Sequence, residues 1–282
     1  MDRHLRHYKG SQLRLQSNTE WIRTSLGGFT MPYIDNNGTN IHYQVDGNQD
    51  GPPLVLMHGT NMSLEDWYEY GWVDGLKNDY RLVLIDHRGM GHSDKPHDPD
   101  SYALELRVAD IVAVLDELGI AKANYFGYST GGWISFGIAK YASERFDSLI
   151  IGASHTYPRD FAEMRESFSQ GIDAYMAQDI ANNPSFVITD WYKTRRLAND
   201  HLAIIALQQD RPDMSDVIPS MTMPCMMYVG EADPMFPQVL ECAKQMPNTR
   251  VVSSPGLDHR QGFLRSDVGL PHVRKFLAEV SS

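Results

Sequence analysis

Three residues far apart in the chain could together form an activated hydroxyl nucleophile: Ser129, Asp233 and His259. A serine hydroxyl is a weak nucleophile until a neighbouring base takes its proton. Histidine can be that base, because its ordinary pKa of about 6.5 allows proton uptake and release near neutrality. A carboxylate on the other ring nitrogen orients the imidazole. The surrounding elements must therefore bring the three side chains to one place.

The segment around Ser129 has the pattern of a sharp turn between a strand and a helix. The apolar run that ends at Gly127 predicts a buried strand, and apolar residues from Trp133 to Tyr141 predict a helix. Gly127 and Gly131 flank the serine as Gly-x-Ser-x-Gly, and their missing Cβ atoms permit the tight turn of a nucleophile elbow. The first N–H groups of the helix would then face an oxyanion formed at the serine.

The predicted acid follows a strand. Residues 225–229 form a compact apolar run, and Gly230-Glu-Ala-Asp-Pro234 comes directly after it. We favour Asp233 over Glu231 as the partner of the histidine, because Pro234 restricts Asp233 to an extended conformation. The aspartate also has one rotatable bond fewer to immobilise.

The predicted base lies in the loop after the last predicted strand. Residues 249–253 predict that strand, and residues 264–280 predict the closing helix. His259 stands between them, where it can meet a side chain that follows another strand of the same sheet.

A second glycine-containing loop follows the strand predicted at residues 54–57. His58-Gly-Thr-Asn61 comes next, before a helical pattern over residues 64–76. Such a loop leaves backbone N–H groups free at the carboxyl edge of a parallel sheet. The main chain of Thr60 is therefore the candidate second oxyanion donor, against the alternative of an ordinary loop between a strand and a helix.

The strand predicted at residues 82–85 leads into the polar segment Asp86-His-Arg-Gly-Met-Gly-His-Ser-Asp94. His87 and His92 could suggest a metal site, but no helical pairing or known ligand spacing relates them to the aspartates. The segment is predicted to be a structured loop, and no metal site is expected.

The remaining pattern alternates strands with helices. Asn37-Gly38 between two alternating runs predicts a β-hairpin, residues 101–118 predict an amphipathic helix, and residues 147–153 predict a further strand. This alternation indicates a doubly wound α/β fold, with a mostly parallel sheet and helices on both faces.

The alternation stops between residues 155 and 219, where helical patterns rich in aromatic residues and methionine add no strand. We predict a helical cap there, over a core formed by residues 31–154 and 220–282. Residues 1–30 are polar and slightly basic, and predict a loosely packed N-terminal arm. Arg195-Arg196 in the cap is interpreted as part of a solvated helix face, against the alternative of an anion clamp.

Net charge, cysteine content and the length of apolar runs indicate which kinds of partner and compartment to expect. The 282 residues carry a formal net charge of −11, which argues against nucleic acid, since phosphates attract a basic surface. Cys225 and Cys242 are too few for a disulfide framework, and no apolar run has the length of a membrane span or a signal peptide. We therefore expect a cytoplasmic protein that binds neither nucleic acid nor membrane. A homo-oligomer is compatible with this composition.

Taken together, these motifs resemble those of the α/β-hydrolase family over residues 31–282, in the order serine, aspartate, histidine. The resemblance implies an eight-stranded type of sheet with an inserted cap. It assigns Ser129 as nucleophile, Asp233 as acid and His259 as base, with the main-chain N–H groups of Thr60 and Thr130 as the oxyanion hole. The motifs that carry it are His58-Gly59, Asp86–Ser93, Gly127–Gly131, Gly230–Pro234 and Gly256–His259.

The leading functional expectation is a serine esterase acting on a small or medium, largely apolar ester without metal or cofactor. Met62, Tyr128 and His155 are the candidate substrate contacts. A serine at the elbow argues against the family's branches with aspartate there, the haloalkane dehalogenases and epoxide hydrolases. A cofactor-free perhydrolase or haloperoxidase, a lactonase and a carbon–carbon bond hydrolase remain alternatives. A ligand receptor with little turnover is an alternative outside enzymes.

Overall fold

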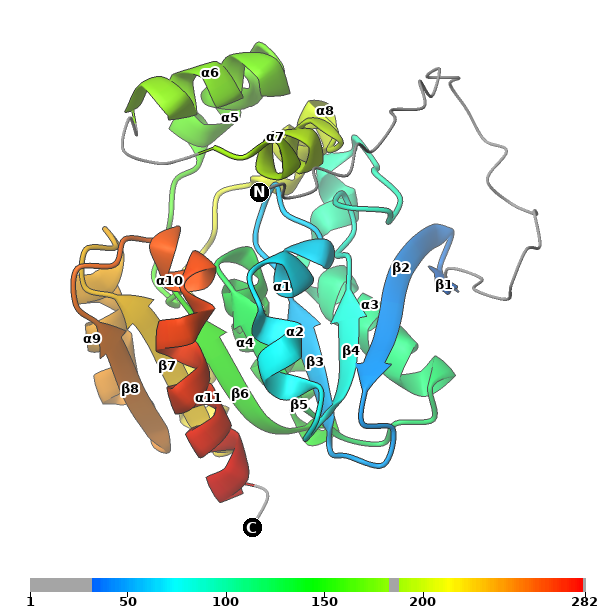
Figure 1. The fold of residues 1–282 in the computed structure, drawn as a ribbon, viewed down its shortest axis with the longest axis vertical. Helices are drawn as coiled ribbons and strands as arrows, with labels where there is room; N and C mark the ends of the chain where they lie inside the picture. Colours follow the sequence, from blue (N-terminus) through cyan, green and yellow to red (C-terminus); the bar gives the residue numbers. More distant parts are fainter. Residues whose placement is uncertain (1–31, 183–187, 281–282) are drawn as a thin grey trace, which may run out of the picture. The chain divides into compact units, whose positions relative to one another are not determined.

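A computed structural model describes residues 32–182 and 188–280, which form an α/β domain around one sheet (Figure 1). The arm predicted at residues 1–30 lies outside the described residues. The eight strands are ordered β1-β2-β4-β3-β5-β6-β7-β8. Their bounds are β1 Tyr33–Asn36, β2 Thr39–Gly47, β3 Pro53–Met57, β4 Arg81–Ile85, β5 Ala123–Tyr128, β6 Phe146–Gly152, β7 Cys225–Gly230 and β8 Thr249–Ser254.

The sheet is parallel except at one edge. β1 pairs with β2, and β2 with β4, in antiparallel register, whereas all other neighbours are parallel. Asn37 and Gly38 join β1 to β2 with φ values of 54° and 84°, as the predicted tight hairpin requires. β5 is buried along its whole length, which fits its continuous apolar sequence. The predicted doubly wound, mostly parallel sheet is confirmed.

Helices cover both faces of the sheet (Figure 1). α3 and α4 pack together on one face and α9 packs on β7 and β8, while α2 and α11 pack together on the other face. The helices outside the insertion are α1 Glu65–Glu69, α2 Trp72–Leu76, α3 Leu104–Glu117, α4 Thr130–Tyr141, α9 Phe236–Gln245, α10 Gln261–Leu264 and α11 Ser266–Val280.

Two predicted helices differ from the structure. The helical pattern over residues 64–76 is two short helices, because Gly71 adopts φ 78° between α1 and α2. The closing helix predicted from residue 264 starts at Ser266 instead, because Arg265 leaves helical geometry with ψ 61°.

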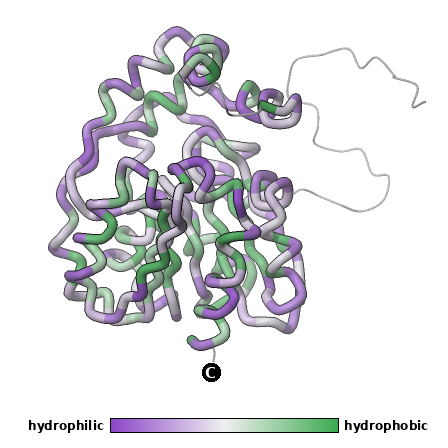
Figure 2. The backbone as a smooth tube through the Cα atoms, turned by 60° about the vertical axis from the view of Figure 1, so that its left-hand side comes forward, coloured by the Kyte–Doolittle hydropathy of each residue, from purple (hydrophilic) through white to green (hydrophobic). Residues whose placement is uncertain are grey.

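The hydrophobic core lies on both sides of the sheet and includes the fully buried rings of Trp67, Trp72, Phe126 and Phe136. Figure 2 shows hydrophobic segments gathered within the sheet layer and hydrophilic ones over many of the outer turns. Within residues 32–182 and 188–280, no helix has both the length and the apolar character needed to cross a membrane.

In the described part of the chain between β6 and β7, four α-helices lie beyond the carboxyl ends of the strands (Figure 1). They are α5 Ala162–Ser169, α6 Ile172–Asn182, α7 Asp190–Leu197 and α8 His201–Leu207. Phe168, Met176 and Ile204 form a second apolar cluster with Tyr102 of the main domain. We call this segment the cap and keep residues 155–219 as its proposed extent.

Asp86 connects three segments beneath the cap. Its fully buried carboxylate accepts hydrogen bonds from His42 Nδ1 at 2.7 Å, Leu64 N at 2.7 Å and His92 N at 2.9 Å, and His58 Nε2 lies 3.4 Å away. Burial by itself would raise the pKa of Asp86, but the hydrogen bond from His42 and the nearby His58 imidazole hold it well below its ordinary value. The segment predicted as a structured loop is therefore fixed by a buried carboxylate.

We expect Asp86→Asn to lower the free energy of unfolding by about 3 kcal/mol at pH 7, because the amide cannot accept all of these hydrogen bonds. The folded-state pKa is depressed, so the carboxylate stabilises the fold above the unfolded-state pKa of about 3.9, and this contribution is lost as the pH falls. Urea titrations of both proteins between pH 3 and 7 should show the difference shrinking below about pH 4.

Asp50→Asn is the matched control, because this exposed aspartate lies in a turn. It should leave the free energy of unfolding within about 0.5 kcal/mol of wild type. Equal stability of the Asp86 variant and wild type at pH 7 would contradict the role given to the buried carboxylate.

Candidate active site

Ser129 occupies a strained turn between β5 and α4, with φ 56° and ψ −110°. Positive φ is uncommon outside glycine, and a surrounding structure must hold it. A Cβ on Gly127 would lie 2.2 Å from the carbonyl oxygen of Gly131, and one on Gly131 would lie 2.2 Å from that of Met57. Both glycines are thus required by close backbone contact, as the predicted elbow demands.

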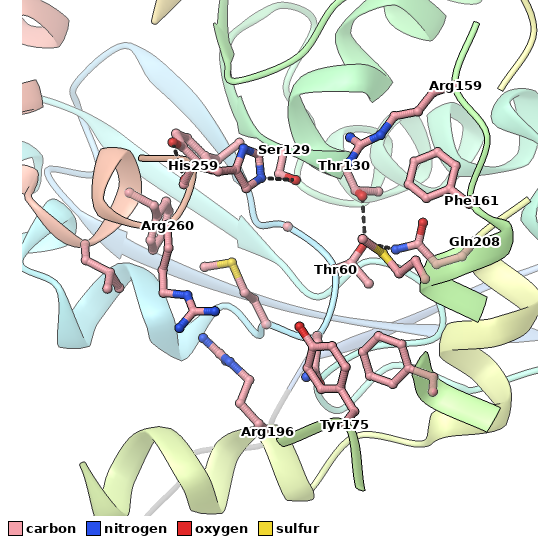
Figure 3. A pocket seen from close by; sticks show the side chains of 18 of the residues that line it. Thr60, Ser129, Thr130, Arg159, Phe161, Tyr175, Arg196, Gln208, His259 and Arg260 are labelled. Atoms are coloured by element: carbon pink, nitrogen blue, oxygen red, sulfur yellow. Dashed lines mark hydrogen bonds between the residues drawn. The ribbon is translucent and has the colours of Figure 1, made fainter. Parts of the chain in front are cut away.

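The three sequence-predicted side chains meet at this turn (Figure 3). His259 Nε2 lies 3.0 Å from Ser129 Oγ, and His259 Nδ1 lies 2.7 Å from Asp233 Oδ2. Because an ionised carboxylate can only accept, Nδ1 donates to Asp233 and Nε2 is left to accept from the serine hydroxyl. Asp233 is buried and its other oxygen accepts from Met235 N at 2.9 Å.

The alternative acid points elsewhere. Glu231 is exposed, and its carboxylate accepts a hydrogen bond from Ser253 Oγ at 2.8 Å on β8. The histidine loop has a further support, because Tyr128 donates its hydroxyl to the carbonyl of His259 at 2.9 Å. Asp233 is therefore the carboxylate that the geometry pairs with the histidine.

The two candidate oxyanion residues are linked by their side chains. Thr60 Oγ1 and Thr130 Oγ1 are 2.7 Å apart, Gln208 Nε2 donates to Thr60 Oγ1 at 2.9 Å, and Arg211 donates to Thr130 Oγ1 at 3.1 Å. Within the described residues, the backbone N–H groups of Thr60 and Thr130 have no acceptor. These amides remain available to a substrate oxygen beside Ser129.

A cavity of about 190 Å³ opens over Ser129 between the main domain and the cap (Figure 3). Met62 and Tyr128 line it as predicted. His155 does not: it is buried beside Tyr157, where the chain has turned away after β6. The cap contributes Arg159, Phe161, Met164, Phe168, Tyr175, Tyr192, Arg196, Gln208 and Arg211.

Apart from Arg196, three of these lining residues were not predicted as site residues, namely Arg159, Gln208 and Arg211. They stand in polar segments at the two ends of the cap, where sequence alone gives no signal that distinguishes them from solvated loop residues. Gln208 is 2% exposed and Arg211 is 9% exposed, because the fold closes over them.

The interpretation of Arg195-Arg196 as a solvated face is wrong for Arg196. This guanidinium is buried and forms a two-pronged ion pair with Asp66 of α1, with N···O distances of 2.5 and 3.1 Å. Burial would lower the pKa of Arg196, but the Asp66 carboxylate raises it above its ordinary value. Arg195 pairs with Glu65, and both side chains are partly exposed. The sequence around Arg196 does not indicate Asp66 as its partner, because α1 is distant in the chain.

Burial and nearby arginines shift the pKa values of Tyr175, which lines the cavity, and of His155, which does not. Burial raises the pKa of Tyr175 to about 12, so its phenol stays protonated. Burial, together with Arg159 and Arg211, lowers the pKa of His155 to about 4, so this ring is neutral at pH 7. No group of three or more histidine, cysteine, aspartate or glutamate side chains in the described part of the chain could hold a metal ion.

Comparison with known proteins gives one family. A family model described as the alpha/beta hydrolase fold matches residues 52–196. Epoxide hydrolase 4 of Mus musculus is 35% identical over 140 residues, which are 49% of this chain and only 38% of the mouse protein. A non-heme chloroperoxidase of Streptomyces lividans is 28% identical over 276 residues, covering 85% of this chain and 96% of that protein.

A pimeloyl-[acyl-carrier protein] methyl ester esterase of Vibrio parahaemolyticus is 26% identical over 270 residues, covering 84% of this chain and 98% of that protein. Among solved structures, the enol-lactonase of Burkholderia xenovorans LB400 superposes with a TM-score of 0.75 at 24% identity, covering 88% of this chain and all of that one. This structural likeness supports the fold.

We expect the buried pair between Asp66 and Arg196 to tie the cap to the main domain. Arg196→Ala should lower the free energy of unfolding by about 3–5 kcal/mol, because it leaves a buried carboxylate without its partner. A double-mutant cycle with Asp66→Ala, measured by urea unfolding, should give a coupling of about 2 kcal/mol or more.

Glu65 and Arg195 are the matched control, since they join the same two helices at the surface. Their cycle should give less than about 1 kcal/mol. A coupling for Asp66 and Arg196 no larger than that of this exposed pair would overturn the assignment.

Proposed function

Because the chain belongs to the alpha/beta hydrolase family, we propose that it is a serine esterase that cleaves a small carboxylic ester through an acyl-enzyme. The observation that carries the proposal is the hydrogen-bonded series from Ser129 through His259 to Asp233 beside two free backbone amides. The hydrolase family itself is common to the esterase, the chloroperoxidase and the other relatives.

In the first half-reaction, Ser129 Oγ attacks the ester carbonyl while His259 Nε2 takes its proton. The carbonyl oxygen becomes an oxyanion, which the N–H groups of Thr60 and Thr130 stabilise. A single such donor is worth about 3–4 kcal/mol in the transition state. The protonated histidine, held by Asp233, then gives its proton to the leaving alkoxide, and the acyl group stays on the serine.

In the second half-reaction, His259 takes a proton from water, whose oxygen attacks the acyl carbonyl. The same amides stabilise the second oxyanion, and its collapse breaks the acyl–serine bond. The proton on His259 returns to Ser129 Oγ, so the enzyme is regenerated with one carboxylic acid and one alcohol as products. Water, Ser129 and His259 account for every proton transferred and every bond formed or broken in the cycle.

A perhydrolase is the second candidate, because the chloroperoxidase relative matches nearly the whole chain. In that reaction hydrogen peroxide would replace water as the attacking group and a peracid would be the product. Incubation with peroxide and acetate, followed by peracid detection, separates it from the esterase. Lactone and carbon–carbon bond cleavage use the same nucleophile and are distinguished by product analysis.

We expect Ser129→Ala to lower kcat on p-nitrophenyl acetate by about 10⁴- to 10⁶-fold, because the nucleophile is lost. The melting temperature should stay close to wild type, since one hydroxyl at a turn contributes little to stability. Ser143→Ala, at a partly exposed position in the short 3-10 helix after α4, is the control and should retain full activity. Residual activity above a tenth of wild type in Ser129→Ala would contradict the assigned nucleophile.

The acid is tested by comparing two neighbouring carboxylates. Asp233→Asn should lower kcat by about 10⁴-fold, because the amide stabilises the wrong histidine tautomer. Glu231→Gln serves as the matched control and should change kcat by less than about threefold, because its carboxylate binds Ser253. Steady-state kinetics on the same ester would decide, and a larger loss in Glu231→Gln would move the acid to that residue.

A further inference from the structure

Two arginines face each other at the base of the cap. Arg159 precedes α5 and Arg211 follows α8, and the two residues form an antiparallel bridge. Arg159 N donates to Arg211 O at 3.1 Å, and Arg211 N donates to Arg159 O at 2.9 Å. Directly opposed residues of an antiparallel pair carry their side chains side by side, and like charges in such a pair are destabilising.

Within the described residues, neither guanidinium has a carboxylate within 4 Å. Arg211 is nine-tenths buried, its guanidinium carbon lies 4.4 and 4.8 Å from the ring centroids of Trp133 and Phe161, and the guanidinium's one hydrogen-bond acceptor among these residues is Thr130 Oγ1. Arg159 lies 4.6 Å from the centroid of Phe161, and its acceptor is the thioether of Met235 at 3.0 Å, a weak one. Among the described residues, most of their ten N–H donors thus have no strong acceptor.

This arrangement differs from that of the other two arginines of the cavity. Arg196 is paired with Asp66, and Arg260 with Asp179 at 2.6 Å. Burial, with Arg107 and Arg159 nearby, lowers the pKa of Arg211 well below its ordinary value. Arginine nevertheless keeps its charge in proteins, so a buried guanidinium without a counter-ion is costly. An anion in the cavity would remove that cost.

The position of the pair relative to Ser129 indicates which part of a substrate it would meet. Figure 3 shows His259 on one side of Ser129, and Thr130 with Arg159 on the other. His259 protonates the leaving alkoxide, so the alcohol part must lie on the histidine side. The carbonyl oxygen faces the amides of Thr60 and Thr130, so the acyl part takes the remaining direction, along the cavity that Arg159 and Arg211 line.

We propose that Arg159 and Arg211 bind a carboxylate at the far end of the acyl group, so that the substrate is a monoester of a dicarboxylic acid. The proposal rests on the esterase function above and defines its substrate class. A carboxylate suits the site because its two oxygens match the fork of a guanidinium. A cavity of about 190 Å³ limits the acyl group to a short chain.

If the two arginines had only a structural role, the expected kinetics would differ. If Arg211 only supported Thr130, its loss would slow charged and neutral esters alike. A carboxylate-binding role instead changes the preference between two esters that differ only in charge. The ratio of kcat/KM for such a pair is therefore the decisive measurement.

The experiment compares the p-nitrophenyl monoester of glutarate with the same compound whose free carboxylate is methylated, each corrected for its spontaneous rate. Wild type should prefer the charged ester by at least about tenfold. Arg159→Gln and Arg211→Gln should each lower this ratio about 10- to 100-fold, mainly through a higher KM for the charged ester. Arg211→Lys should retain more of the preference than Arg211→Gln, since it keeps the charge without the fork.

Arg274→Gln is the matched control, because this exposed arginine of α11 pairs with Asp79 away from the cavity. It should leave both rates unchanged. If an arginine variant fails to fold, calorimetry of Ser129→Ala with glutarate tests the site directly, with neutral glutaramide as the comparison. Glutarate should bind and glutaramide should not.

The outcomes separate the two proposals. Turnover of both esters with a ratio near one, and no binding of glutarate, would overturn the carboxylate site and leave the esterase standing. No turnover of either ester would overturn the esterase. Glutarate binding in that second case would support the anion site as part of a binding protein.

Discussion

The site depends on the close contact between the backbone at Ser129 and the end of β3. Gly131 lies against the carbonyl of Met57, and Gly127 lies against Gly131, so no side chain fits at either position. This contact holds Ser129 at φ 56°, and it places the amide of Thr130 beside the loop that carries Thr60. One steric constraint thus positions the hydroxyl and both amides together.

Buried carboxylates hold in place loops and cap helices that are not part of the sheet. The Asp86 carboxylate gathers donors from β2 and from the loops after β3 and β4, and the Asp66 carboxylate reaches α7 of the cap through Arg196. Each of these carboxylates has charged or polar partners at short range, as buried charges require. The pair Arg159 and Arg211 at the base of the cap is an exception, because neither guanidinium has a carboxylate partner among the described residues. This pair lies beside the turn that carries Ser129.

Local patterns were sufficient to predict the sheet and the sharp turn at Ser129, and to place Asp233 directly after a strand, because each of these features depends on neighbours within a few residues. Gly-x-Ser-x-Gly, the apolar run before Asp233 and the Asn37-Gly38 turn all carry their own geometry. The partners of Arg196, Gln208 and Arg211 lie more than eighty residues away, so composition could not reveal them. Gly71 separates α1 from α2, but the helical periodicity of residues 64–76 favoured one continuous helix.

The bridge between Arg159 and Arg211 also brings the two ends of the cap together. The chain leaves the main domain and returns to it at one pair of residues, so helices α5 to α8 begin and end at nearly the same point. A segment attached in this way can change in length and sequence without altering the strand register beneath it. In evolutionary terms, selection could alter which molecules reach the serine while the reaction chemistry is inherited unchanged.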